Sequence, residues 1–377
     1  MSAVLRALDP PDAGRLARLV AKLHATPALV WGDFVLDEYW RCRSSRVSRE
    51  APVLVLDWEE REVQFGGAAN AALNLAAMGA KVAVVGWIGD DAAGAELRAG
   101  LEARGIDTQG LLAMPLAHTV VKVRVTAGSV HTARQQVVRI DRGSVFAPSR
   151  AQAAGMTRAL EIASASARAI VLSDYGYDSV TPALAARWIR PWTKAGAVVA
   201  LDSRYRLAHY RGVTLATPNE SEAAAAAGIV IGDVRDLARA AARLRRLLGA
   251  RELVITRGRD GLTLWSRRAG VSLEAHGGHE AVDVTGAGDA VVAAATLALA
   301  RGAAPALAAA LANVAGSVAV SRRGAVAVSA ADLLRALGMR LPAARMDGTR
   351  PRTAARSNSA RIPRPRAATP RRSPRSR

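Results

Sequence analysis

The segment Val282-Asp283-Val284-Thr285-Gly286-Ala287-Gly288-Asp289, followed by the apolar run 290–300, decides how the chain is interpreted. Closely spaced glycines at the start of a long Ala/Val/Leu helix leave backbone N–H groups unpaired, and the helix dipole favours negative charge there. Asp289 would lie beside this anion site, where a carboxylate can deprotonate a hydroxyl that attacks phosphorus. The segment indicates phosphoryl transfer, although in many α/β proteins such a turn only permits close packing and caps a helix.

The segments around this turn alternate between strand and helix, with short connections. We expect strands at 28–33, 81–87, 169–173, 198–202, 214–217 and 253–256, and helices at 71–78, 92–104, 149–168, 181–195, 219–227 and 234–248. Such alternation predicts an α/β fold with a mostly parallel sheet flanked by helices. Polar residues at the strand ends would line the carboxyl edge of the sheet, where open α/β sheets bind ligands.

Three residues or pairs near the beginning are candidates for substrate binding. Asp33 ends a buried strand and could accept hydrogen bonds from a polyhydroxylated substrate, or it could be an ordinary turn Asp. Gly66 and Gly67 would let a ligand approach the backbone, and Asn70 offers a donor and an acceptor one turn into the next helix. The alternative is that the glycines only relieve crowding before an Ala-rich helix.

Two segments further on are candidates for binding a metal and phosphates. Asn219 and Glu222 share one face of a helix and could hold waters around Mg²⁺, although a helix cap explains the same residues. Thr256-Arg257-Gly258 could contact nucleotide phosphates through its hydroxyl, backbone and guanidinium, although alone it is only a turn. The sequence contains no Gly-Lys-Ser/Thr ending of a Walker A loop.

Residues 41–65 and 118–142 contain short β-branched runs between polar segments. Lys122 and Arg124 are interleaved among valines in the second of these. We expect a small antiparallel sheet that projects from the main domain and serves as a lid and a dimer surface.

Composition and charge place limits on the class of protein. The 377 residues include a single cysteine, Cys42, which excludes an intramolecular disulfide and predicts a reducing, cytoplasmic location. Met1 to Thr26 resembles an amphipathic helix more than a signal peptide, and the apolar stretch 290–320 is broken by Arg301, Pro305 and Asn313, so we predict no membrane span.

The formal net charge of +20 is concentrated at the end of the chain. Residues 340–377 contain twelve Arg and one Asp among Pro, Ser, Thr and Ala, which predicts a disordered basic tail after a domain at 1–339. Such a tail could contact nucleic acid or an anionic surface through charge alone, and a solvated extension without a partner is the alternative.

Together these motifs resemble the PfkB, or ribokinase-like, carbohydrate kinase family. The residues that carry the resemblance are Gly32-Asp33, Gly66-Gly67 through Asn70, Asn219 through Glu222, and Asp283 to Asp289. Segments 32–40, 45–53, 172–175 and 211–222 further resemble its D-glycero-β-D-manno-heptose-7-phosphate kinase branch. This resemblance implies a ribokinase-like fold and ATP- and Mg²⁺-dependent phosphorylation of the anomeric hydroxyl of that sugar phosphate, for ADP-heptose and lipopolysaccharide core synthesis.

The resemblance also implies a role for each matching residue. Asp289 would be the general base, with an anion hole formed by Gly286, Ala287 and Gly288. The sugar would be held by Asp33, Gly66, Gly67 and Asn70, and its phosphate by Arg124. Mg²⁺ and the nucleotide would be held by Asn219, Glu222, Thr256, Arg257 and Gly258, with Asn313 near adenine. The resemblance further implies a homodimer and leaves open a monovalent-cation requirement.

Two segments depart from the pattern of the branch. Asp202-Ser203-Arg204 replaces the usual Asp-Pro-Lys, so Arg204 would substitute for a nucleotide-side lysine, and Gly176-Tyr177-Asp178 replaces Ala-Lys-Gly. The tail also lacks a His-x-Gly-His signature, so we expect a separate nucleotidyltransferase. Two alternatives stay open: another sugar or nucleoside kinase of the family, or a catalytically weak homologue that acts as a basic interaction module.

Overall fold

The main sheet has ten strands in the part of the chain described by the computed structural model, residues 5–7, 12–128, 134–266, 270–277 and 281–339. In spatial order they are β1 (Leu5–Ala7), β14 (Gly270–Leu273), β13 (Leu262–Trp265), β12 (Glu252–Thr256), β11 (Leu215–Ala216), β10 (Val198–Ser203), β9 (Ala169–Asp174), β2 (Pro27–Gly32), β5 (Lys81–Gly89) and β6 (Asp107–Met114). All pairings are parallel except those of β13 with its two neighbours. The predicted mostly parallel sheet is confirmed.

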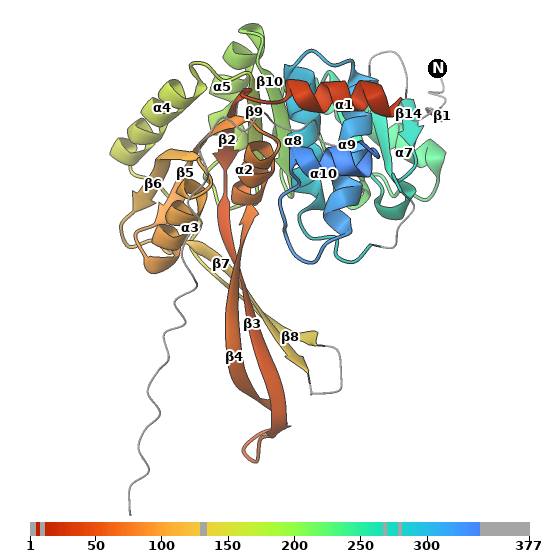
Figure 1. Ribbon diagram of the computed structural model, residues 1–377. Coiled ribbons are helices and arrows are strands. Elements are labelled where there is room, and N and C mark those ends of the chain that lie inside the picture. Colours follow the sequence, from red (N-terminus) through yellow and green to blue (C-terminus); the bar gives the residue numbers. More distant parts are fainter. Residues whose placement is uncertain (1–4, 8–11, 129–133, 267–269, 278–280, 340–377) are drawn as a thin grey trace, which may run out of the picture. The chain divides into compact units, whose positions relative to one another are not determined.

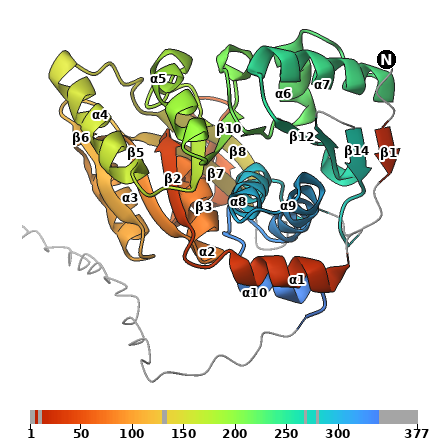
Figure 2. The same ribbon diagram turned by 90° about the horizontal axis from the view of Figure 1, so that it is seen from above.

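Helices cover both faces of this sheet (Figure 2). One face carries α2 (Ala68–Ala77), α3 (Ala92–Glu102), α8 (Ala287–Ala300) and α9 (Pro305–Val320), with α1 (Ala13–Lys22) and α10 (Ala330–Ala336) packed on α9. The other face carries α4 (Arg150–Ser164), α5 (Pro182–Lys194), α6 (Glu220–Ala227) and α7 (Val234–Leu248). Because side chains alternate along a strand, Val30 of β2 packs into the first core and its neighbour Trp31 into the second.

Four further strands form the lid, which extends from the main sheet in Figure 1. They are β4 (Leu54–Gly67), β3 (Phe34–Val47), β7 (Val120–Gly128) and β8 (Gln135–Arg142), in that order. The expected antiparallel arrangement holds for the two outer pairs, whereas β3 and β7 pair in parallel. Strand β3 begins at Phe34, directly after β2 ends at Gly32, so the lid starts at the carboxyl edge of the main sheet.

Several elements extend beyond their predicted limits. Strand β3 begins before residue 41, and β4 ends after residue 65. The short connections include the 3-10 turns η1 (Leu207–His209) and η2 (Gly258–Asp260). In the described ranges, no helix has the length and apolar character needed to cross a membrane. The predicted tail at 340–377 lies outside the described residues.

Candidate functional site

Helix α8 starts at Ala287, immediately after the glycine of the phosphoryl-transfer signature. Gly286 is the N-cap residue and has a φ of 77°, a conformation that L side chains rarely adopt. A Cβ atom at this position would lie 2.5 Å from Nδ2 of Asn70, so any other residue would clash with the side chain of Asn70. Asp289 lies in the first turn of α8, where the sequence places it.

The carboxylate of Asp289 is buried and only half satisfied. Its Oδ2 accepts a hydrogen bond of 2.7 Å from Nδ2 of Asn70, whereas its Oδ1 has no partner in the described part of the chain. Burial, together with the negative charge of nearby Asp37, raises the pKa of Asp289 to about 7, although hydrogen bonding from Asn70 and Tyr175 and the positive charge of Lys122 oppose the shift. A buried carboxylate with a free oxygen and a pKa near neutrality is suited to accept a proton from a ligand.

Asp37 of β3 lies on the lid side of Asp289. A Cβ atom on Gly66 would come within 2.2 Å of Asp37 Oδ2, so the glycine at this position of β4 makes room for the carboxylate. Arg124 of β7 donates to Asp37 Oδ1 at 2.5 Å and lies over the ring of Tyr39, 5.2 Å from its centroid. The sequence singled out Arg124 as a phosphate ligand, but its guanidinium already has a carboxylate partner.

Lys122, two residues earlier on β7, faces the same space. Its side chain is buried, and its ammonium lies 5.3 Å from the ring centroid of Tyr175 and 5.9 Å from that of Tyr177. Among the described residues it forms no ion pair. Burial lowers the pKa of Lys122, and the positive charges of Arg139 and Arg204 act in the same direction, while the negative charge of Asp37 opposes the shift. A lysine at an inward position in a run of valines was the sequence signal for this group.

Asp33 is placed differently from the sequence-based expectation. It is completely buried at the end of β2, and both of its carboxylate oxygens accept backbone N–H groups from residues 175, 177 and 179. The carboxylate whose negative charge acts on Asp289 belongs to Asp37. The sequence could not indicate this, because the three donors lie more than 140 positions away along the chain.

A cavity of about 910 Å³ lies along the carboxyl edge of β10 to β12 and reaches the first turn of α8 at Ala287 and Gly288. It is lined by several of the predicted residues, namely Arg204, Asn219, Glu222, Thr256, Gly258, Ala287, Gly288 and Asn313. It is also lined by Tyr175 and Asp202, whose roles the sequence did not specify. We call this space the edge cavity.

Arg257 takes a different direction from its neighbours in the predicted phosphate-binding turn. Its Nε lies 3.0 Å from Oε2 of Glu220, and it is not among the residues that line the edge cavity. Asn313 of α9 does line it and donates through Nδ2 to the carbonyl oxygen of Glu274 at 2.6 Å.

Asn219 and Glu222 form a capping box at the start of α6. Oδ1 of Asn219 accepts the backbone N–H of Glu222 at 2.8 Å, and Oε2 of Glu222 accepts the backbone N–H of Asn219 at 2.9 Å. Both side chains also line the edge cavity, as does Asp202, and burial raises the pKa of Glu222 and of Asp202. Within the described residues, no three His, Cys, Asp or Glu side chains cluster as metal ligands.

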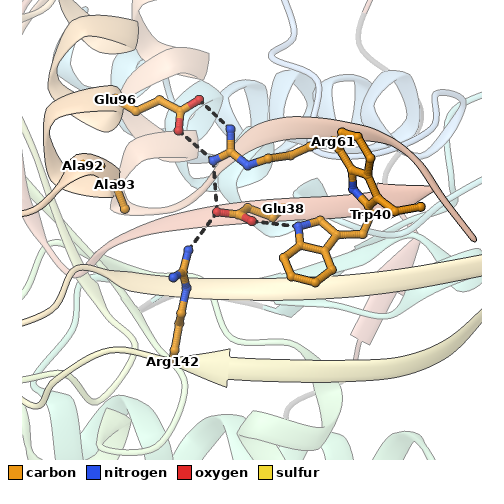
Figure 3. A pocket seen from close by; sticks show the side chains of 8 residues that line it. Glu38, Trp40, Arg61, Ala92, Ala93, Glu96 and Arg142 are labelled. Atoms are coloured by element: carbon orange, nitrogen blue, oxygen red, sulfur yellow. Dashed lines mark hydrogen bonds and ion pairs between the residues drawn. The ribbon is translucent and has the colours of Figure 1, made fainter. Parts of the chain in front are cut away.

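A buried carboxylate, that of Glu38 in β3, helps to connect the lid to the main domain (Figure 3). Glu38 accepts hydrogen bonds from Arg61 at 3.0 Å, Arg142 at 3.1 Å and Nε1 of Trp40 at 2.9 Å. Arg61 also binds Glu96 of α3 at 2.7 Å, beside a cavity of about 400 Å³. Burial alone would raise the pKa of Glu38, but the hydrogen bonds and the positive charges of the arginines hold this pKa below its usual value. Through Arg61 the network connects β3 to α3 and so holds the lid strand that carries Asp37 in a fixed position relative to the main domain.

Comparison with known proteins supports the carbohydrate kinase resemblance. The chain is 41% identical over 312 residues to the bifunctional protein HldE of Geobacter metallireducens, covering 82% of this chain and 63% of that relative. It is 40% identical over 322 residues to the protein of the same name from Caulobacter vibrioides, covering 84% of this chain and 65% of the relative. The chain thus spans less than two thirds of the length of these relatives.

Solved structures share the fold at lower sequence identity. A ribokinase of Arabidopsis thaliana complexed with ribose and ATP superposes with a TM-score of 0.66 at 18% identity, over 84% of this chain and 100% of that one. Phosphofructokinase-2 of Escherichia coli in complex with potassium gives a TM-score of 0.65 at 18% identity, over 83% and 98%. The ribokinase-like α/β fold is therefore confirmed.

The sequence model described as pfkB family carbohydrate kinase matches residues 29–331, which include the lid, Asp37, Asn70 and the start of α8. The chain belongs to the pfkB family of carbohydrate kinases.

Proposed function

We propose that the protein transfers the γ-phosphoryl group of ATP to the anomeric hydroxyl of D-glycero-β-D-manno-heptose 7-phosphate, giving the 1,7-bisphosphate. The observation that carries the reaction class is the buried Oδ1 of Asp289 at the start of α8, which has no hydrogen-bond partner among the residues that the structure describes. The sugar follows from the resemblance to the heptose kinase branch and is supported by 41% identity to a bifunctional protein HldE.

Residues of this chain would divide the work of the reaction as follows. Oδ1 of Asp289 accepts the proton of the attacking hydroxyl, while Asn70 holds the other carboxylate oxygen in place. The backbone N–H groups of Gly286 and Gly288 stabilise negative charge on the phosphoryl group during transfer, whereas that of Ala287 already donates to the carbonyl oxygen of Val284 at 3.4 Å. Asp37 accepts hydrogen bonds from sugar hydroxyls, a role that we prefer for it over Asp33 because the oxygens of Asp33 already have backbone partners.

The edge cavity fits ATP in size and chemistry. Its volume of about 910 Å³ is in the range of small-molecule sites. Backbone and polar side chains at the ends of three neighbouring strands line it, among them Asp202, Thr217 and Thr256. Arg204, Thr256 and Gly258 would contact phosphates, with Asn313 near the base.

The acidic side chains of the edge cavity suit a metal that retains its water ligands. Glu222 and Asp202 both line the cavity, and Asn219 adds an amide beside them. Mg²⁺ bound with ATP is often held by one or two carboxylates and several waters, which agrees with two carboxylates rather than a complete protein cage. When bound, Mg²⁺ would neutralise charge on the phosphates.

Lys122 favours a phosphorylated sugar over a neutral one. It is a buried cation without an ion-pair partner among the described residues, and it lies on the same side of Asp289 as Asp37. The attraction of Asp37 compensates only partly for the burial of this charge, so an anionic ligand group would complete this part of the site. Arg124 stays a second candidate through its position next to Asp37.

The raised pKa of Asp289 predicts the pH dependence of the reaction. The base is active when ionised, so kcat/KM should fall about tenfold per pH unit as the pH drops below about 7. Replacing Asp37 by Asn removes a negative charge that raises this pKa and should move the acidic limb to lower pH. The check is the pH profile of kcat/KM for both proteins, and a flat wild-type profile from about pH 5 to 8 would contradict the role of Asp289.

The experiment that tests the proposed substrate is ADP release with Mg-ATP. D-glycero-D-manno-heptose 7-phosphate should be turned over in preference to ribose, fructose 6-phosphate and adenosine. Turnover with another acceptor alone would assign the chain to a different kinase of the family. No turnover with any acceptor, together with nucleic-acid binding that disappears on deletion of residues 340–377, would favour the basic interaction module.

The remaining proposals rest on the sequence and on the resemblance alone. They are a cytoplasmic location, a homodimer that uses the lid, a nucleotidyltransferase that consumes the product, and a monovalent-cation requirement as an open question.

A further inference from the structure

Asp33 holds a loop of the main sheet in place. Its Oδ2 accepts the backbone N–H of Tyr175 at 2.8 Å and that of Tyr177 at 3.0 Å, and its Oδ1 accepts the backbone N–H of Ser179 at 2.9 Å. We call residues 174–180, the last residue of β9 and the segment that follows it, the Tyr175 loop. One carboxylate therefore accepts the backbone N–H of every second residue from 175 to 179, and these three hydrogen bonds fix the path of the loop.

Arg206 also holds the Tyr175 loop, through contacts with both of its ends. The guanidinium donates from Nε to Asp174 at 3.0 Å and from Nη2 to the carbonyl oxygen of Val180 at 3.0 Å, and it also binds Asp178. Asp178 belongs to one of the two segments that depart from the heptose kinase pattern. Ser203 belongs to the other, and its hydroxyl donates to Asp174 at 2.9 Å. The two departures thus contribute to one network around the loop.

The Tyr175 loop connects the two halves of the site. Tyr175 lines the edge cavity, and its ring also lies 5.3 Å from the ammonium of Lys122 on the lid side. Tyr177 contributes a second ring next to the same ammonium. A shift of this loop would therefore displace the wall of the edge cavity and the surroundings of Lys122 together.

We infer that Asp33 is a positioning residue, which fixes the Tyr175 loop through three backbone hydrogen bonds and so places Tyr175 between the two substrates. This inference rests on the proposed kinase function for its kinetic consequences and on the hydrogen bonds alone for its structural ones. It differs from the sugar-binding role that the sequence resemblance implies for Asp33.

The first test is hydrogen exchange of the full-length protein without substrates. Asp33→Asn is nearly isosteric but replaces one acceptor oxygen by an NH₂ group, which faces backbone donors. Exchange at the amides of Tyr175, Tyr177 and Ser179 should accelerate by about tenfold or more, because hydrogen bonds to a charged group are among the stronger ones. Unchanged protection of these amides would overturn the inference, whatever the protein phosphorylates.

A second substitution and a matched control make this test specific. Asp33→Ser leaves room for water and retains one acceptor, so it should also accelerate exchange in the loop. It serves as the test variant if Asp33→Asn does not fold. Asp91 is the control, because its carboxylate also accepts backbone N–H groups, from Gly94 at 2.8 Å and Thr119 at 3.0 Å. Asp91→Asn should leave exchange in residues 174–180 unchanged, and acceleration there would indicate a general loss of stability instead.

The kinetic test separates positioning from direct contact with the sugar. Because Tyr175 borders both halves of the site, Asp33→Asn should raise KM for ATP and for the sugar and should lower kcat by about tenfold. A direct sugar ligand would change KM for the sugar and leave that for ATP unaltered, which would overturn the inference. If the wild-type protein has no kinase activity, the proposed function fails, and the exchange result still decides the role of Asp33.

Discussion

We expect Asp289→Asn to lower kcat by about 10² to 10⁴-fold while the protein stays folded. The substitution removes the only proton acceptor proposed for the sugar hydroxyl but preserves the shape of the side chain. The amide oxygen can still accept from Asn70, as Oδ2 of Asp289 does at 2.7 Å. Because burial raises the pKa of Asp289, ionising it in the folded protein costs free energy, so the Asn variant should melt at an equal or higher temperature near pH 8.

The measurement is steady-state ADP release at saturating substrates, together with thermal unfolding. Glu252→Gln is a suitable control. Glu252 also has a buried oxygen without a hydrogen-bond partner in the described ranges, but it lies at the amino end of β12, away from the site. It should leave kcat unchanged. Near-full activity of Asp289→Asn would mean that another group accepts the proton.

The second large effect is expected for Lys122→Met, which keeps the apolar length of the side chain and removes its charge. If Lys122 binds the phosphate of the sugar substrate, kcat/KM for that substrate should fall about 10- to 100-fold, as for the loss of a hydrogen bond to a charged group. Lys122 also lowers the pKa of Asp289, so the comparison belongs at about pH 9, where the base is ionised in both proteins.

Comparison with the unphosphorylated heptose makes the prediction for Lys122 specific. The ratio of kcat/KM for the sugar phosphate to that for the free sugar should decrease in Lys122→Met and should be largely retained in Lys122→Arg, which keeps the positive charge. An equal loss for both sugars would show that Lys122 supports the fold of the lid and does not recognise phosphate.

The parts of the site that sequence predicts well are formed by neighbours along the chain. Gly286 and Asp289 belong to one helix start, and the backbone geometry of that start follows from the glycine and the apolar helix behind it. Asn219 and Glu222 form their capping box within four residues. In such local motifs, residue type and spacing determine the geometry, so a sequence pattern contains nearly all of the information.

The parts that it predicts poorly depend on partners that are distant in the chain. Nothing near Asp33 indicates that its carboxylate meets three N–H groups from the end of β9, and nothing near Arg257 indicates that Glu220 draws its side chain away from the edge cavity. Asp37 illustrates the same limit, since its place beside Asp289 depends on how the lid returns to the main domain.

The lid has a consequence for how enzymes of this architecture can diversify. The side chains proposed to contact the sugar come mainly from lid strands, as Asp37 and Lys122 do, whereas the edge cavity is built from β10 to β12, α6, α8 and α9. Acceptor preference and donor binding are thus encoded in largely separate parts of the gene. Descendants of one ancestor could exchange lid residues, adopt a new sugar and still use the same phosphoryl donor.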